Sequence, residues 1–127
     1  LYREIARRLG LDLEKEIGGV VSFCDLPAER LLKVKDLLPK ENLNDRQNLA
    51  PRLKCFLDIA ELYPETKFTG YVVVGADRED KRLTIDGVIF PRTRGKFSRL
   101  IDLLDRRFQP DEIAISEDGK EILLWWD

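Results

Sequence analysis

A β-hairpin between residues 67 and 90 is the feature that most constrains the fold of this chain. Its sequence, KFTGYVVVGADREDKRLTIDGVIF, has two halves of alternating apolar residues around a charged turn. Side chains alternate between the two faces of a strand, so the apolar pattern indicates a pairing register. The register that aligns the apolar positions pairs Val74 with Leu83, Val72 with Ile85, Gly70 with Gly87 and Phe68 with Ile89.

This register predicts two unlike faces for the hairpin. The aliphatic face has a notch where Gly70 meets Gly87, which favours close packing of a helix over binding of a ligand. The opposite face carries Tyr71 and Phe90, and the C-terminal segment adds Trp125 to it. So wide an apolar surface is rarely left to water. We therefore expect Tyr71, Phe90 and Trp125 to form an interface or a stacking face.

Hydrophobic periodicity predicts the elements on either side of this hairpin. In chain order we expect a helical segment at 1–18, a strand at 20–24, helices at 27–38 and 51–62, the hairpin, a helix at 97–108 and a second hairpin that turns at Asp118-Gly119. The second hairpin would pair Ile113 with Leu124 and Ile115 with Ile122. Leu123 and Trp125 would then point to the other face.

This element order predicts an α+β fold with an antiparallel sheet of ferredoxin-like, split β-α-β-β-α-β topology. The N-terminal helix, an inserted helix and an extra C-terminal strand are additions to that pattern. We expect one domain over 1–127, with a helical segment at 1–18 and the sheet-and-helix core at 19–127. A winged helix fits less well, because about a dozen residues separate the two middle helices where a helix-turn-helix has a tight turn.

The composition limits the partners and the compartment. Charged residues make up 36% of the chain, which predicts a surface rich in ion pairs, as in thermophile proteins. A net charge of −2 argues against bulk attraction to nucleic acid or to an anionic membrane. No apolar run could span a bilayer, and no signal-peptide pattern opens the chain. Cys24 and Cys55 lie in apolar stretches and are expected to be buried free thiols of a cytoplasmic protein rather than a disulfide.

The chain contains no histidine, and this excludes several chemistries. Ser–His–Asp and Cys–His nucleophiles cannot be built, and neither can a zinc site with histidine ligands. Two cysteines are too few for an all-cysteine zinc site, and no phosphate-binding glycine motif occurs. We expect no catalytic residue, no cofactor and no metal site. An enzyme that uses carboxylates alone is the least favoured alternative.

A basic stretch follows the first hairpin and precedes a predicted helix. Arg92, Arg94, Lys96 and Arg99 lie in it. Cations beside the free N–H groups of a helix start can bind phosphate, so these four residues are candidates for a phosphate or nucleic-acid site. The simpler interpretation is a solvated loop in a highly charged chain.

Together these observations predict a small cytoplasmic binding or interaction module without catalytic machinery. We expect a homodimer that associates through the second face of the sheet. The N-terminal helix or a ligand could cover that face instead. The alternative function is binding of nucleic acid or of a phosphate ligand through loop 92–99 and the aromatic face.

Overall fold

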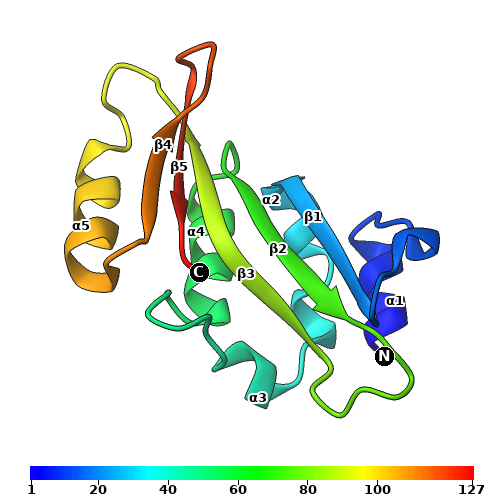
Figure 1. Cartoon of the computed structure of the whole chain (residues 1–127). Coiled ribbons are helices and arrows are strands. Elements are labelled where there is room, and N and C mark those ends of the chain that lie inside the picture. Colours follow the sequence, from blue (N-terminus) through cyan, green and yellow to red (C-terminus); the bar gives the residue numbers. More distant parts are fainter.

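The computed structural model describes residues 1–127 as an antiparallel sheet with helices packed against it (Figure 1). The strands are β1 (Val20–Pro27), β2 (Lys67–Val73), β3 (Arg82–Pro91), β4 (Glu112–Ile115) and β5 (Glu121–Trp125). The α-helices are α1 (Tyr2–Arg8), α2 (Ala28–Leu32), α3 (Lys40–Leu43), α4 (Leu53–Leu62) and α5 (Ser98–Phe108), with 3-10 turns at Leu13–Lys15 and Lys35–Leu37. The predicted α+β class is confirmed.

The order of the strands in the sheet is β1-β2-β3-β5-β4, which is not the predicted ferredoxin-like order. A ferredoxin-like sheet would place another strand between β1 and β2, whereas here these two strands pair directly and antiparallel. The reason is the connection between them. A single crossover helix would return the chain to the end where β1 began. Here α2 takes the chain back along the sheet and α4 returns it to the end where β1 finished. Lys67 at the start of β2 therefore pairs with Pro27 at the end of β1.

The C-terminal half retains a split β-α-β unit. Strands β3 and β4 lie on either side of β5 and are both antiparallel to it. The predicted register of the second hairpin is confirmed, since Ile113 pairs with Leu124 and Ile115 with Ile122. Its turn contains Gly119 at a φ of 72°, a conformation that favours glycine.

The register of the first hairpin differs from the predicted one in two respects: the pairs near the turn are shifted by two residues, and β3 contains a bulge further along. The observed pairs include Val72 with Leu83, Gly70 with Ile85, Thr69 with Gly87 and Phe68 with Val88. Asp86 is the extra residue in β3 between the second and third of these pairs. An inserted residue reverses the alternation beyond it, so Val88 and Phe90 join Phe68 on the same face, and Ile89 moves to the other. Hydrophobic periodicity within one strand does not reveal such an insertion.

The predicted glycine notch is absent, because Gly70 and Gly87 do not face each other. A Cβ atom at Gly70 would lie 2.0 Å from the carbonyl oxygen of Thr84. A Cβ atom at Gly87 would lie 2.4 Å from Oγ1 of Thr69. Both glycines therefore allow a close approach of neighbouring strand atoms at the bulge, and they do not form the predicted notch.

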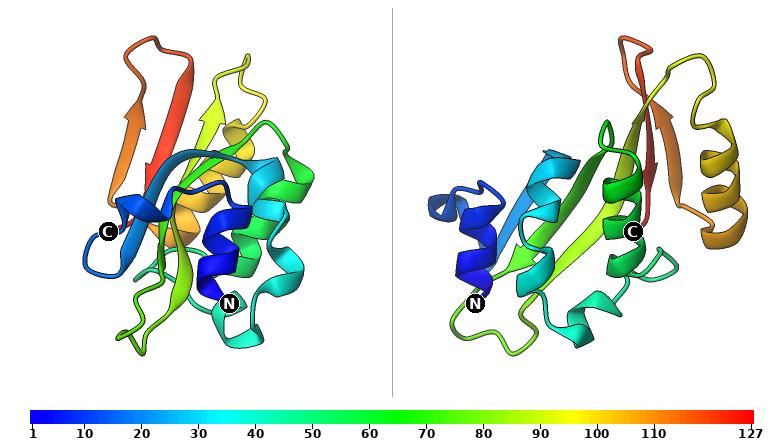
Figure 2. Two further views of the ribbon diagram at one scale, coloured as in Figure 1. Left: turned by 90° about the vertical axis from the view of Figure 1, so that its right-hand side faces the viewer. Right: turned by 180° about the vertical axis from the view of Figure 1, so that it is seen from behind.

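The helices all pack on one side of the sheet (Figure 2). The hydrophobic core lies between these helices and the sheet and includes the fully buried Ile5 and Leu9 from the N-terminal helix. Helix α1 therefore does not cover the second face, which corrects one of the expected arrangements. None of the helices has the length and apolar character that crossing a bilayer requires.

Candidate binding surfaces

The second face of the sheet has no helix over it (Figure 2). We call it the open face. Tyr71 and Trp125 line a shallow cavity of about 390 Å³ on this face, together with Phe23 of β1 and Leu123 of β5. These four side chains are only partly buried. The aromatic face predicted from the sequence is therefore present, and it includes a phenylalanine that the sequence pattern did not assign to it.

Phe90 does not belong to this face. The bulge turns its side chain toward the helices, where it is fully buried. Its ring centroid lies 5.3 Å from that of Phe97, the residue that precedes α5. Phe90 thus anchors α5 on the sheet and cannot contact a partner on the open face.

The open face is acidic at its centre. The carboxylates of Asp86 and Glu112 line the same cavity as the aromatic rings. Asp86 accepts a hydrogen bond from the hydroxyl of Thr69 at 2.6 Å, and Glu112 forms no ion pair. A nucleic acid whose bases stacked on this face would bring its phosphate groups close to two carboxylates, which would repel them. The electrostatics of the face therefore favour a protein surface over a nucleic acid.

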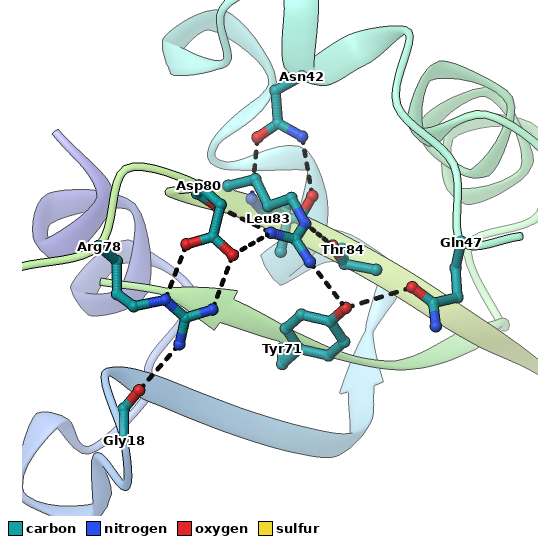
Figure 3. Close-up of polar contacts among 9 residues, drawn as sticks. Gly18, Asn42, Gln47, Tyr71, Arg78, Asp80, Leu83 and Thr84 are labelled. Atoms are coloured by element: carbon teal, nitrogen blue, oxygen red, sulfur yellow. Dashed lines mark hydrogen bonds and ion pairs between the residues drawn. The ribbon is translucent and has the colours of Figure 1, made fainter. Parts of the chain in front are cut away.

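A polar network closes the rim of the open face near the first hairpin turn (Figure 3). Asp80 accepts hydrogen bonds from Nε and Nη2 of Arg78 at 2.8 and 2.7 Å, and from Nη1 of Arg82 at 3.1 Å. Arg82 also donates to the hydroxyl of Tyr71 at 3.2 Å, and that hydroxyl donates to Gln47 at 3.2 Å. The loop before α4 is thereby fastened to the sheet. Tyr71 is held in place by contacts within the chain.

The hydrogen bond from Arg78 is the main reason why the pKa of Asp80 lies well below its ordinary value of 3.8. A carboxylate with a depressed pKa stabilises the fold above the pKa of the unfolded chain and loses this contribution as the pH falls through the folded pKa. The structure contains no group of three or more side chains arranged to hold a metal ion. The ion pairs of Asp80 with Arg78 and Arg82 stabilise the turn.

Substitution Asp80→Asn is therefore expected to make stability less sensitive to acid. Between about pH 4 and pH 2 the melting temperature of the natural chain should fall more steeply than that of the variant, because in the natural chain Asp80 binds a proton in the unfolded state and not in the folded state. Thermal unfolding followed by circular dichroism at several pH values measures both slopes. Asp77→Asn, in the same turn, is the control and should follow the natural chain. Equal slopes for Asp80→Asn and the natural chain would contradict the role given to Asp80.

The predicted basic loop does form the wall of a cavity of about 480 Å³, to which Arg92, Arg94 and Lys96 contribute. Two of these three cations are already engaged. Arg92 donates to the carbonyl oxygen of Gly119 at 3.0 Å, and Lys96 is paired with Glu65. The fourth candidate, Arg99, does not line the cavity. Arg94 is therefore the one cation of this cavity that has no partner in the chain.

A second basic cavity was not predicted. It has a volume of about 490 Å³ and lies between the loop before α4, the start of α4 and the end of α5. Four cations line it: Arg46, Arg52, Lys54 and Arg107. Three of them lie close together in the sequence, and the fourth comes from a helix more than fifty positions away. Their spacing in the sequence gives no sign of this convergence, which depends on how α5 packs beside α4.

Comparison of the chain with protein-family models, with curated proteins and with solved structures gives no match. Its functional interpretation therefore rests on the surfaces described above.

Proposed function

We propose that this protein is a non-catalytic binding module that forms a homodimer through the free edge of β4 and the adjoining part of the open face. The observation that carries this proposal is the exposure of two isoleucines on a sheet edge. Ile113 is 48% exposed and Ile115 is 58% exposed. Large aliphatic side chains on an unpaired strand favour association with another strand.

The backbone of β4 supports the same conclusion. Ser116 N donates to the carbonyl oxygen of Glu121 at 3.0 Å. Hydrogen-bonded pairs alternate along an antiparallel ladder, so the N–H and C=O groups of Ile113 and Ile115 point away from β5. A second β4 strand related by a two-fold axis would run antiparallel to the first and could satisfy these groups in both copies at once. This self-complementarity favours a second copy over an unrelated partner.

The other edge of the sheet, strand β1, is protected against the addition of another strand. The edge at β4 is therefore the one available for pairing with a second copy. Strand β1 is irregular between Phe23 and Leu26, and Asp25 has a φ of 55°. Pro27 ends the strand and has no N–H to donate. Bulges and prolines are common devices that prevent strand addition. Strand β4, at the opposite edge, has neither device (Figure 1).

The edge of β4 also adjoins an apolar part of the open face, although the side chains of Ile113 and Ile115 point to the helix side together with their partners Leu124 and Ile122. One shallow cavity joins Ile115 and Ala114 of β4 to Leu123 of β5 and Ile89 of β3. A second copy seated at β4 would cover this part of the face. We place the dimer in the cytoplasm as part of the same proposal, which the two free thiols support. The expectation that both thiols are buried is wrong, because Cys24 is exposed and Cys55 is only partly buried.

The dimer is tested by light scattering after gel filtration. The natural chain is expected to elute with twice the chain mass of 14.8 kDa. The double variant Ile113→Lys with Ile115→Lys should elute with the mass of one chain, because charges at a strand edge oppose pairing. Leu62→Lys is the matched control, since Leu62 is 70% exposed on α4, away from β4, and it should remain dimeric. A natural chain that is monomeric at tens of micromolar would disprove the proposal.

Binding of a phosphate-bearing ligand is the second candidate function. The observation that favours it is the set of four cations around the cavity between α4 and α5. The loop at 92–99 supports it less well, because Arg92 and Lys96 are held by their own chain.

A further inference from the structure

The side chains of the four cations of the cavity between α4 and α5 form no ion pair and no hydrogen bond within the chain. Arg46, Arg52, Lys54 and Arg107 take part in none of the eight ion pairs. Their side chains also donate none of the side-chain hydrogen bonds of the structure, unlike Arg78, which makes three. These charges are therefore free to bind a ligand.

All the charged residues that line the cavity are basic. No aspartate or glutamate lines it, although acidic residues outnumber basic ones in the chain. Asp58, which helps to raise the pKa of the Cys55 thiol, lies one turn further along α4 and is not among the lining residues. Four like charges around one cavity repel one another, and nothing in the packing of the chain requires them to be there. An anion in the cavity would remove this repulsion.

The walls between the cations suit an organic anion. Leu49, Cys55 and Phe108 supply apolar surface to the same cavity. The guanidinium of Arg107 lies 5.7 Å from the ring centroid of Phe108, so one planar cation is already placed beside an aromatic ring. Arginine side chains can donate two parallel hydrogen bonds to a phosphate. A cavity of about 490 Å³ is of the size that usually accommodates a small molecule.

The start of α4 adds one free backbone donor, the N–H of Lys54. Arg52 is the N-cap residue and makes no capping hydrogen bond with its side chain. Leu53 N donates to Asp45 O at 2.8 Å, while Lys54 N has no partner outside the helix. The first turn of a helix carries a partial positive charge, which adds to that of the four side chains.

From these contacts we infer that the cavity between α4 and α5 binds a small molecule that carries two or more phosphate groups, with Arg46, Arg52, Lys54 and Arg107 as the phosphate ligands. The cavity is local, and the open face of the sheet carries the carboxylates of Asp86 and Glu112. A long polyanion would lack a continuous basic track, so the charge distribution favours a small phosphate ester over a nucleic acid.

Isothermal titration calorimetry at low salt tests the site, with pyrophosphate, adenosine triphosphate and a short single-stranded oligonucleotide as probes. We expect saturable binding of both small phosphates to one site, with an affinity that falls as salt is added. The double variant Arg52→Gln with Arg107→Gln should weaken this binding at least about tenfold, because each charge-assisted hydrogen bond contributes strongly to the affinity. Arg46→Gln with Lys54→Gln is the second test pair, should the first fail to fold.

The matched control is Arg7→Gln with Lys33→Gln, which removes the same charge from two exposed residues that line neither basic cavity. This control should bind both small phosphates as the natural chain does. Equal weakening by the control would show a bulk effect of charge and overturn the proposed site. Binding of the oligonucleotide alone would overturn the small-molecule assignment. The absence of saturable binding of both small phosphates would overturn the whole inference.

Discussion

Substitution Phe56→Ala is expected to lower the free energy of unfolding by about 3–5 kcal/mol, the usual range for a phenylalanine in a closed core. Phe56 lies on α4 and is fully buried. Its ring packs edge to face against Phe68 of β2, with 6.2 Å between centroids, and against Trp126, with 5.9 Å between centroids. Its removal would leave a cavity between α4, the middle of the sheet and the C-terminal segment.

Urea unfolding followed by circular dichroism measures this loss. The fluorescence of Trp126 should shift as well, because its indole packs on Phe56 and donates to the carbonyl oxygen of Phe108 at 2.8 Å. Leu62→Ala, on the same helix, is the control. Leu62 is 70% exposed, and its truncation should change stability by less than about 0.5 kcal/mol. A loss below about 1 kcal/mol for Phe56→Ala would show that the core does not depend on this ring.

Periodicity within one segment was enough to predict most of the helices and strands. The strands of the first hairpin begin at the predicted residues, Lys67 and Arg82. The whole register of the second hairpin is confirmed, because it depends on a tight turn and on the alternation of a few residues. These features depend on neighbours in the sequence, which is why the sequence reveals them.

Features that depend on distant segments were not predictable in this way. The bulge at Asp86 changes the face of Phe90, and only the packing of α5 against the sheet shows that Phe90 is needed inside. The direct pairing of β1 with β2 depends on a second helical pass, and the sequence predicted two helices there without their directions.

The candidate sites follow the same rule. Tyr71 and Trp125 were assigned to the open face from alternation alone, and both line it. Arg92, Arg94 and Lys96 were grouped because they are close in sequence, yet two of them have partners in the chain. The unpaired cations of the cavity between α4 and α5 come from separate segments. A cluster of this kind becomes visible only when the helices are placed beside each other.

Asn42 protects the part of β3 that no strand covers. Strand β5 pairs with β3 from Gly87 onward, so the outer edge of β3 at Leu83 has no neighbouring strand. The buried side-chain amide of Asn42 takes its place (Figure 3). Its Nδ2 donates to Leu83 O at 2.8 Å, and its Oδ1 accepts from Leu83 N at 2.9 Å. The hydroxyl of Tyr2 also donates to Oδ1 at 2.9 Å, which fastens α1 to the same point.

Substitution Asn42→Ala is expected to lower the free energy of unfolding by about 3 kcal/mol. It would leave the N–H and C=O groups of Leu83 and the hydroxyl of Tyr2 without their partner, and each buried polar group left in this way costs about 1–3 kcal/mol, with incomplete additivity. Urea unfolding measures the loss, and hydrogen exchange locates it. The amide of Leu83 should exchange much faster in the variant, while amides between β2 and the far half of β3 should stay protected.

Asn44→Ala is the matched control for this substitution. Asn44 is exposed, and its Nδ2 makes one hydrogen bond, to Lys40 O at 3.1 Å. Removal of a single exposed hydrogen bond should change stability by less than about 1 kcal/mol and leave the exchange of Leu83 unaltered. If Asn42→Ala were no more destabilising than Asn44→Ala, or if Leu83 kept its protection, water would satisfy this edge equally well. In that case the amide of Asn42 would not stand in for a strand.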